Sequence, residues 1–278
     1  MGILILVIVL LLVLSVIFFK LPYSKTASEF GHTVADKISG TAIYSDVFKE
    51  EDLVDLPLPV QKYFRNCGYL GTPKMSYMKA SFSDVDFIMS PEKTIKIDYV
   101  QYNFVEMPDR FALISSSLLG IPFEGLDCYL DGAGSMKGTF AKIITLFDQR
   151  GPEMDKSSLV TVLAECLLVP NTALQTYIEW EAVDDTHSKA IISWHGISAS
   201  GIFSFDEEGK ALSFRTSDRT ATDMQGVARQ AEWSGIYSHY QKTNGVMQPT
   251  VLQSIWHYPE GDCVYFNENE SVVKIEYF

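Results

Sequence analysis

Two arginines and three aromatic residues in the last third of the chain have the types and spacing of a ligand-binding face. Arg215 and Arg219 fall on one face of a predicted strand, Trp233 and Tyr237 share a face of the next strand, and Trp256 lies on the strand after that. If these strands are neighbours, guanidinium groups lie beside aromatic rings, which suits an acidic or amphipathic ligand. The same pattern fits a solvent-facing sheet whose rings cover the arginine side chains, so both interpretations stay open.

The carboxylates give a weaker case for catalysis. Glu165, near the end of a predicted helix, is the acid we would assign to a hydrolase, and we include it among the candidate ligand-binding residues. Paired-carboxylate catalysis needs two acids facing each other across a pocket, and the sequence does not reveal such a pair. Glu179 and Glu181 alternate with Ile178 and Trp180, which is typical of a solvated strand face. Whether the chain is an enzyme stays open, and we assign no catalytic residue.

Two segments approximate catalytic motifs but depart from them at decisive positions. In DGAGSMKG (residues 131–138), Lys137 occupies the position of the third glycine of a dinucleotide-binding fingerprint. In GISASG (residues 196–201), the second glycine comes one residue too late for a nucleophile elbow, and the flanking segments both predict strands. We interpret both segments as turns.

The histidines and cysteines form no recognisable metal or redox motif. His239 and His257 fall on neighbouring predicted strands, so a metal pair is an alternative. We expect ordinary surface or core histidines, no metal and no other cofactor. The cysteines have the spacing of neither a zinc site nor a C-x-x-C motif: Cys67, Cys128, Cys166 and Cys263. Buried thiols are the simplest interpretation, and disulfides stay open.

The composition describes an acidic, aromatic-rich globular chain. Its 278 residues contain 22 Lys and Arg against 35 Asp and Glu, which gives a net charge of −13. Nucleic acid is therefore not an expected partner, because phosphate binding needs clustered cations. A hydrophobic content of 47% excludes a disordered chain, and an aromatic content of 13% favours β structure.

The first residues predict a membrane anchor. Residues 2–19 contain Ser15 as their one polar side chain, and a helix of this length spans about 27 Å, close to the bilayer core. No charged side chain precedes the segment, and Phe18-Phe19-Lys20 is unlike a signal-peptidase site. We predict a single-pass protein that contacts the bilayer through residues 2–19; a cleaved signal and a core helix are the alternatives. Lys20 and Lys25 follow the span and favour a cytosolic domain by the positive-inside rule.

The rest of the chain predicts an α+β fold that is mostly β. Apolar spacing indicates helices at about residues 57–67, 137–149 and 155–168. Alternating segments separated by turns, including Asn244-Gly245, indicate an antiparallel meander. We expect the N-terminal transmembrane helix to be followed by a curved antiparallel sheet packed on a few helices.

Three parts of the chain follow from these patterns. We predict an anchor over residues 1–20, a stem over residues 21–54 and a β-rich domain over residues 55–278. Residues 20–50 lack sustained periodicity, so we expect them to tether the domain rather than to fold.

Three segments resemble an uncharacterised bacterial family of membrane-anchored domains: LPLPVQKYFRNCGYLG, DGAGSMKG and GPEMDKSSLVTVLAECLLVPNTALQTYIEW. The positions that carry the resemblance are Pro59, Gln61, Tyr63, Gly132, Gly134, Met136, Glu165, Pro170 and Trp180. The chain departs at Leu168-Val169, where many members have Trp before the proline. The resemblance covers about residues 55–278 and implies a domain that follows a membrane span and lies outside the cytosol, against the lysine count. It implies no activity. The sheet-over-helices plan is also similar to that of periplasmic lipoprotein carriers.

Three functions remain as hypotheses. The first is a membrane-anchored binding module for a lipid or other amphipathic ligand, held between sheet and helices with Arg215 and Arg219 at the mouth of the site. The second is a hydrolase-type enzyme that uses Glu165 or a histidine. The third is a structural or assembly partner of an envelope protein.

Overall fold

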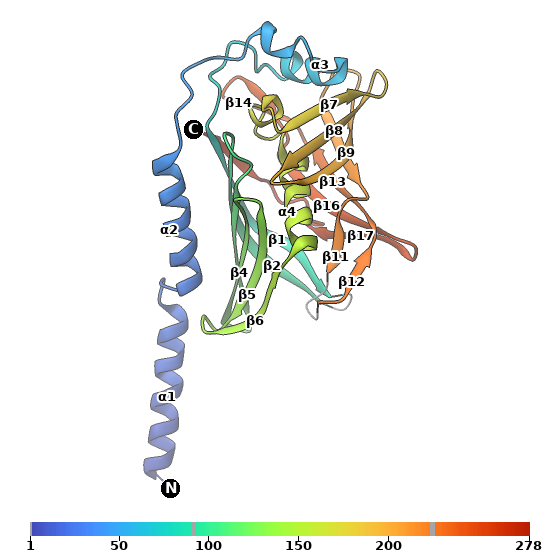
Figure 1. The fold of residues 1–278 in the computed structure, drawn as a ribbon. Coiled ribbons are helices and arrows are strands. Elements are labelled where there is room, and N and C mark those ends of the chain that lie inside the picture. Colours follow the sequence, from blue (N-terminus) through green and yellow to red (C-terminus); the bar gives the residue numbers. More distant parts are fainter. Residues whose placement is uncertain (1, 91–92, 223–225) are drawn as a thin grey trace.

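Most strands of the chain join one antiparallel sheet in the computed structural model, which describes residues 2–90, 93–222 and 226–278 (Figure 1). The sheet has 14 strands in the order β6-β5-β4-β3-β2-β1-β17-β16-β13-β10-β9-β8-β7, and β18 pairs with β1. These strands are β1 (Tyr77–Ser90), β2 (Lys93–Phe104), β3 (Arg110–Leu118), β4 (Ile121–Leu130), β5 (Ala133–Phe140), β6 (Ile144–Arg150), β7 (Ile178–Ala182), β8 (His187–Trp194), β9 (Ile197–Phe205), β10 (Ala211–Thr216), β13 (Glu232–Ser238), β16 (Val251–Tyr258), β17 (Gly261–Phe266) and β18 (Lys274–Tyr277).

Shorter elements complete the fold. Two small hairpins are β11 (Thr220–Thr222) with β12 (Ala228–Gln230), and β14 (Gln241–Thr243) with β15 (Val246–Gln248). The helices are α1 (Gly2–Lys20), α2 (Lys25–Gly40), α3 (Leu58–Asn66) and α4 (Pro152–Glu165), and the 3-10 helices are η1 (Glu50–Leu53) and η2 (Thr172–Leu174).

Two meanders make up the large sheet, and helix α4 links their outer edges. Strands β1 to β6 follow one another in the chain, and β7 to β10 with β13, β16 and β17 form the second half. The halves meet where β1 pairs with β17 and β18. The edge strands, β6 and β7, are consecutive strands of the chain, and α4 lies between them in the sequence and contacts strands of both halves. The sheet therefore curves around α4 (Figure 1), and the predicted fold class is confirmed.

A glycine lets the first half of the sheet approach α4 closely. The Gly134 amide donates to Asp155 Oδ1 in the first turn of α4 at 2.7 Å. A Cβ atom at Gly134 would lie 2.4 Å from the carbonyl oxygen of Met154. No side chain fits between strand and helix at this point, so glycine sets the distance at which α4 packs.

Two buried tyrosines fix the other end of α4. The Tyr63 hydroxyl, from α3, donates to the Leu167 carbonyl oxygen at 2.6 Å. The Tyr237 hydroxyl, from β13, donates to the Ala164 carbonyl oxygen at 2.6 Å. Ala164 lies in the last turn of α4, where carbonyl groups lack intrahelical partners, and Leu167 lies two residues beyond the helix.

Part of the predicted stem is a packed helix. Ser24 caps α2 by accepting a hydrogen bond from the Ala27 amide at 3.0 Å. Phe30 and Val34 are buried with apolar residues of β2 to β4, and Lys37 forms an ion pair with the buried Asp109. The expectation that residues 20–50 do not fold is wrong for this segment, because an apolar stripe of few residues was enough to bury one helix face. The division into anchor, stem and domain stays a prediction.

The helix predicted over residues 137–149 is also wrong. This segment forms β5 and β6, which pair antiparallel. A Cβ atom at Gly138 would lie 2.3 Å from the Phe147 ring, so the ring packs directly over the glycine of the neighbouring strand. Pairing along the sheet outweighs the weak helical spacing that the sequence shows here. The other two helix predictions agree with α3 and α4.

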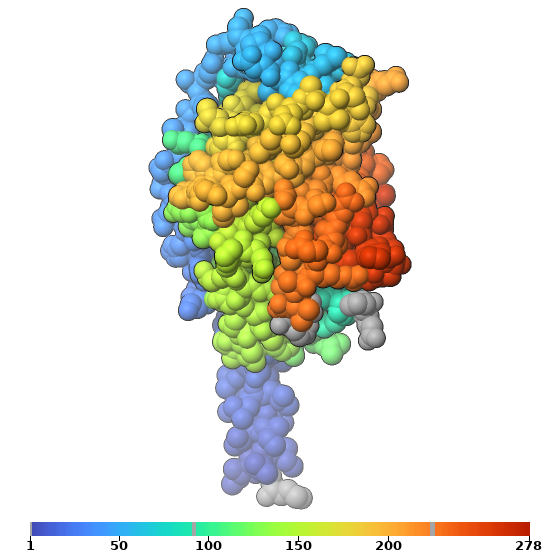
Figure 2. All heavy atoms as spheres, turned by 45° about the vertical axis from the view of Figure 1, so that its right-hand side comes forward, coloured from blue at the N-terminus to red at the C-terminus, as the bar shows by residue number. Residues whose placement is uncertain are grey.

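Helix α1 projects from the domain. It has no buried residue within Gly2–Lys20, and it is long and apolar enough to cross a membrane or to serve as a signal sequence. Figure 2 shows it extending alone beyond the lower end of the domain. Its C-terminal end is held by Lys142, whose Nζ donates to the carbonyl oxygens of Phe18, Leu21 and Tyr23 at 3.1, 2.5 and 3.2 Å.

Candidate ligand-binding site

Arg219 lies on two tryptophan rings on the side of the sheet that faces α4. Its guanidinium carbon is 4.5 Å from the Trp233 ring centroid and 5.8 Å from that of Trp256. The two tryptophans are direct cross-strand partners on β13 and β16. Nη1 of Arg219 is buried and has no hydrogen-bond partner among the described residues. Stacking on the rings compensates part of the cost of removing the cation from water, but the buried Nη1 makes no hydrogen bond within the described residues.

The loop that carries Arg219 is held in place by Asp218. The Asp218 carboxylate accepts hydrogen bonds from the Ser200 amide at 2.8 Å and from Lys156 Nζ of α4 at 2.6 Å. Burial raises the pKa of Asp218, but the hydrogen bonds from Lys156 and Ser200 outweigh it, so the net pKa lies below the ordinary value. The loop is therefore tied to both the sheet and the helix before any ligand arrives.

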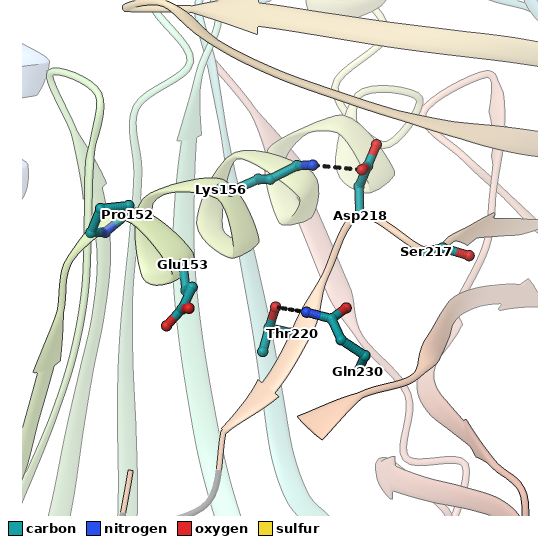
Figure 3. Close-up of a pocket in the computed structure, with 7 residues that line it drawn as sticks. All are labelled: Pro152, Glu153, Lys156, Ser217, Asp218, Thr220 and Gln230. Carbon is teal, nitrogen blue, oxygen red and sulfur yellow. Dashed lines mark hydrogen bonds and ion pairs between the residues drawn. The ribbon is translucent and has the colours of Figure 1, made fainter. Parts of the chain in front are cut away.

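A cleft of about 260 Å³ lies beside this loop (Figure 3). Its lining residues come from the first turns of α4 and from the segments around β11 and β12: Pro152, Glu153, Lys156, Ser217, Asp218, Thr220 and Gln230. Lys156 reaches toward Asp218 on one side, and Gln230 donates to Thr220 Oγ1 at 2.9 Å on the other. The cleft is slightly smaller than the range of about 300–1,000 Å³ typical of small-molecule pockets, and all of its lining residues except Pro152 carry polar side chains.

Further aromatic rings extend the surface on which Arg219 rests. Trp256 stacks on Tyr258 and Tyr265, with ring centroids 6.3 and 6.0 Å away. The Arg229 guanidinium lies 4.3 Å from the Tyr258 ring centroid and binds Glu260 through two hydrogen bonds of 2.6 Å. Arg229 is thus neutralised by a carboxylate, whereas Arg219 is not paired with one among the described residues.

The structure separates the residues that the sequence placed together. Arg219, Trp233 and Trp256 meet, but Arg215 is 53% exposed on the opposite face and pairs with Glu232 at 2.5 Å. The prediction that both arginines share a strand face is wrong, because β10 ends before Arg219 and the chain turns inward there. Tyr237 faces α4 but is occupied by its bond to the helix backbone.

Glu165 belongs to a second polar cluster, which we call the Arg110 cluster and which consists of Arg110, Glu165, Asp127, Asn103 and Tyr99. Arg110 Nε donates to Glu165 at 2.8 Å, and Nη1 donates to Asp127 at 2.7 Å. Asn103 donates to Glu165 at 2.7 Å, and the Tyr99 hydroxyl accepts from Arg110 Nη2. The Arg110 side chain is 5% exposed. Burial lowers the pKa of Arg110, but the charges of Glu165, Tyr99 and Asp127 raise the pKa by more than burial lowers it, so the net shift is upward.

The sequence analysis named Glu165 but missed its partners Arg110 and Asn103. A signal was available, because Gln101 and Asn103 continue the inward face that Ile97 and Tyr99 begin on β2. Polar residues on an otherwise apolar strand face predict a buried hydrogen-bond network. Their partner Glu165 comes from α4, and that pairing depends on how the helix crosses the sheet.

The histidines that were considered as a metal pair lie in different surroundings. His257 contacts Ser234 Oγ at 2.8 Å and Asp262 Oδ1 at 2.7 Å, whereas His239 contacts Ser238 Oγ at 3.1 Å. Over residues 2–90, 93–222 and 226–278, no group of three or more His, Cys, Asp or Glu residues could hold a metal ion. The cysteines are free thiols, and burial raises the pKa of Cys67 to about 12.

The fold places this protein in the class of mostly β proteins, with a large antiparallel sheet that curves around one helix and an apolar helix ahead of it. The chain belongs to a family of unknown function, DUF6544, whose model matches residues 46–268. No curated protein matches the chain. Among solved structures, the chain is similar to a LolA superfamily protein from Nitrosomonas europaea, with a TM-score of 0.36 and 10% identity over 78% of this chain and 91% of that chain.

Proposed function

We propose that the protein is a membrane-anchored module that binds an amphipathic ligand with an acidic group, on the non-cytosolic side of the membrane. The observation that carries the proposal is the buried Nη1 of Arg219, a cationic donor without a partner among the described residues. Leaving such a donor unmet is costly, and a ligand oxygen would satisfy it.

The surroundings of Arg219 suit the two parts of such a ligand. An acidic group would accept from Arg219, with Lys156 and Gln230 lining the neighbouring cleft. The apolar part would lie against the rings of Trp256 and Tyr258. A lipid is the expected source, because the helix that precedes the domain is long enough to hold it at a bilayer.

A hydrolase that uses Glu165 receives less support. Both Glu165 oxygens are engaged by Arg110, and Asn103 adds a further bond. In the part of the chain that the structure describes, the hydrogen bonds of the Glu165 side chain come from Arg110 and Asn103 and not from a histidine. A general acid or base needs an exchangeable proton within reach of substrate, and this carboxylate is committed to a structural ion pair.

Native mass spectrometry tests the ligand site. The full chain in mild detergent is incubated with phosphatidylglycerol or, as the zwitterionic comparison, with phosphatidylcholine. Arg219→Ala removes a charge-assisted bond of about 1.5–3 kcal/mol, so bound phosphatidylglycerol falls about tenfold or more. Arg215→Ala is the matched control, since it removes an exposed arginine from the other face. Equal retention by all three proteins, or equal loss in both variants, contradicts the proposal.

A reporter fusion tests the side of the membrane. Alkaline phosphatase fused after Phe278 is expected to be active, because it folds outside the cytosol. An inactive phosphatase together with a fluorescent cytosolic reporter at the same position places the domain in the cytosol, as the lysines after the span favour.

A further inference from the structure

The β3–β4 hairpin carries a fully exposed leucine at its tip. Its two-residue turn consists of Leu119 and Gly120, with φ angles of 53° and 82°. Turns with positive φ at both central residues favour Asn, Asp or Gly, because a bulky side chain is strained there. Leu119 nevertheless occupies the first position and is 103% exposed. In water this residue stabilises neither the turn nor the core.

The neighbouring β5–β6 hairpin repeats the pattern. Its tip turns through Ala141 and Lys142, with φ angles of 52° and 65°. Ile143 is 73% exposed and Ile144 is 51% exposed. Both tips belong to the same half of the sheet and lie at its lower end, at the level where α1 meets α2 (Figure 1). Exposed apolar residues that gather at one end of a domain indicate a contact surface.

Lys142 ties this end of the domain to the apolar helix. Its Nζ donates to the carbonyl oxygen of Phe18 in α1 and to those of Leu21 and Tyr23 just after the helix, and it lies 5.6 Å from the Phe18 ring centroid. Phe18, Phe19 and Tyr23 provide aromatic side chains near the end of the apolar segment, as is common at membrane interfaces. The β5–β6 tip is therefore attached to the very turn at which α1 would leave the hydrocarbon.

We propose that the tips of these two hairpins, Leu119 and Ile143 with Ile144, insert into the bilayer interface beside α1. The partner is the lipid surface that holds α1, because Lys142 fixes the β5–β6 tip to the end of that helix. The inference rests on the part of the proposed function that keeps α1 in the membrane, and it does not depend on the ligand site. It means that the domain docks on the bilayer in one orientation instead of swinging on a tether.

Depth-dependent quenching tests the insertion. A polarity-sensitive fluorophore is attached to single cysteines in the full chain, with Cys128→Ser and Cys263→Ser replacing the two partly exposed thiols. The labelled variants are Leu119→Cys, Ile143→Cys, Val9→Cys within α1, and Val54→Cys. Val54 is the matched control, since it is 68% exposed and lies in the chain between η1 and α3, and α3 is at the other end of the domain (Figure 1). Each protein is reconstituted in phosphatidylcholine vesicles that contain some phosphatidylglycerol.

The outcomes separate the inference from the anchor. Labels at residues 119 and 143 should show blue-shifted emission and quenching by lipids spin-labelled near the headgroup. The label at residue 9 should be quenched by lipids spin-labelled deep in the acyl chains, and the label at residue 54 by aqueous iodide alone. If residue 9 is quenched as expected but residues 119 and 143 behave like residue 54, the insertion is wrong while the anchor stands. If residue 9 is not quenched, both the membrane anchor and the insertion of the hairpin tips are contradicted. Protection of residues 119 and 143 without lipid quenching identifies a protein contact and overturns the proposal.

Discussion

Two arginines on the α4 side of the sheet have opposite surroundings. Arg110 uses its guanidinium on Glu165, Asp127 and Tyr99, and the polar groups it faces are bonded in return. Arg219 rests on Trp233 and Trp256, and its buried Nη1 has no partner among the described residues. Replacing a paired buried charge exposes its partners to an apolar interior, whereas replacing a stacked arginine leaves no charge stranded. The contrast teaches that burial of an arginine does not by itself indicate a binding site. A buried donor without an acceptor in the protein is the better indication, because a ligand can supply that acceptor.

The largest expected effect comes from Arg110→Ala. It strands Glu165 and Asp127 without their cation, at a cost of about 3–5 kcal/mol. The melting temperature of the full chain should fall by roughly 6–20 °C. Arg150→Ala is the control, since Arg150 forms an exposed ion pair with Asp148 at 2.9 Å and should cost less than about 1 kcal/mol. Similar melting of the two variants would show that the Arg110 cluster does not hold the fold.

Glu165→Gln should reduce stability less than Arg110→Ala, and it tests whether the Arg110 cluster and the Arg219 site act independently. The amide NH₂ group would face donors of Arg110 and Asn103 in place of one oxygen, so one buried donor loses its partner at about 1–3 kcal/mol. Binding of phosphatidylglycerol should not change, because Glu165 contacts Arg110 rather than Arg219. Loss of binding with unchanged melting would restore Glu165 as a ligand-site residue.

Of the three substitutions Arg110→Ala, Glu165→Gln and Arg219→Ala, the last should affect stability least. It removes stacking worth about 0.5–2 kcal/mol, which corresponds to a fall in melting temperature of roughly 1–8 °C. Thermal melting recorded beside the lipid-binding measurement gives both readouts on one sample. A melting loss as large as that of Arg110→Ala, with binding intact, means that Arg219 is structural.

The smallest expected effect is on the pH dependence of the free energy of unfolding. The pKa of Asp218 lies below its ordinary value of 3.8 in the folded state, so the unfolded chain binds this proton more tightly. The stability that Asp218 contributes is complete above the ordinary value and is lost as the pH falls through the depressed folded-state pKa. Denaturant unfolding at neutral and acid pH should show a smaller loss for Asp218→Asn than for the natural chain. Asp185→Asn, in an exposed turn, should follow the natural chain, and identical curves for all three would contradict the role of Asp218.

The sheet and the two helices α3 and α4 could be predicted because alternation and apolar spacing are local signals. Helix α2 could not, since its stability comes from a surface that three distant strands provide. The site was half predictable. Trp233 and Trp256 follow from strand alternation, but the position of Arg219 depends on where β10 ends, and the partners of Glu165 depend on how α4 crosses the sheet.

The residues that carry the family resemblance mostly build the fold. Tyr63 and Gly134 fix the two ends of α4, and the Trp180 indole donates to the Ala173 carbonyl oxygen at 2.9 Å. Gly132 has a φ angle of 84° in the β4–β5 turn. Such a motif identifies an architecture without locating a binding site, which is why the resemblance pointed to Glu165 and not to Arg219.

The pairing of β1 with β17 and β18 has a consequence for folding during synthesis. Strands β1 to β6 leave the ribosome first and can pair in order, but one side of β1 has no partner until β17 and then β18 emerge. Contacts between such distant segments form slowly, because the loop-closure entropy is lost before any contact offsets it. During that interval β1 presents an open strand edge on which another nascent chain can pair. Pairing of β18 with β1 therefore completes a slow folding reaction, and a chain that is truncated before β18 leaves this edge of β1 unpaired.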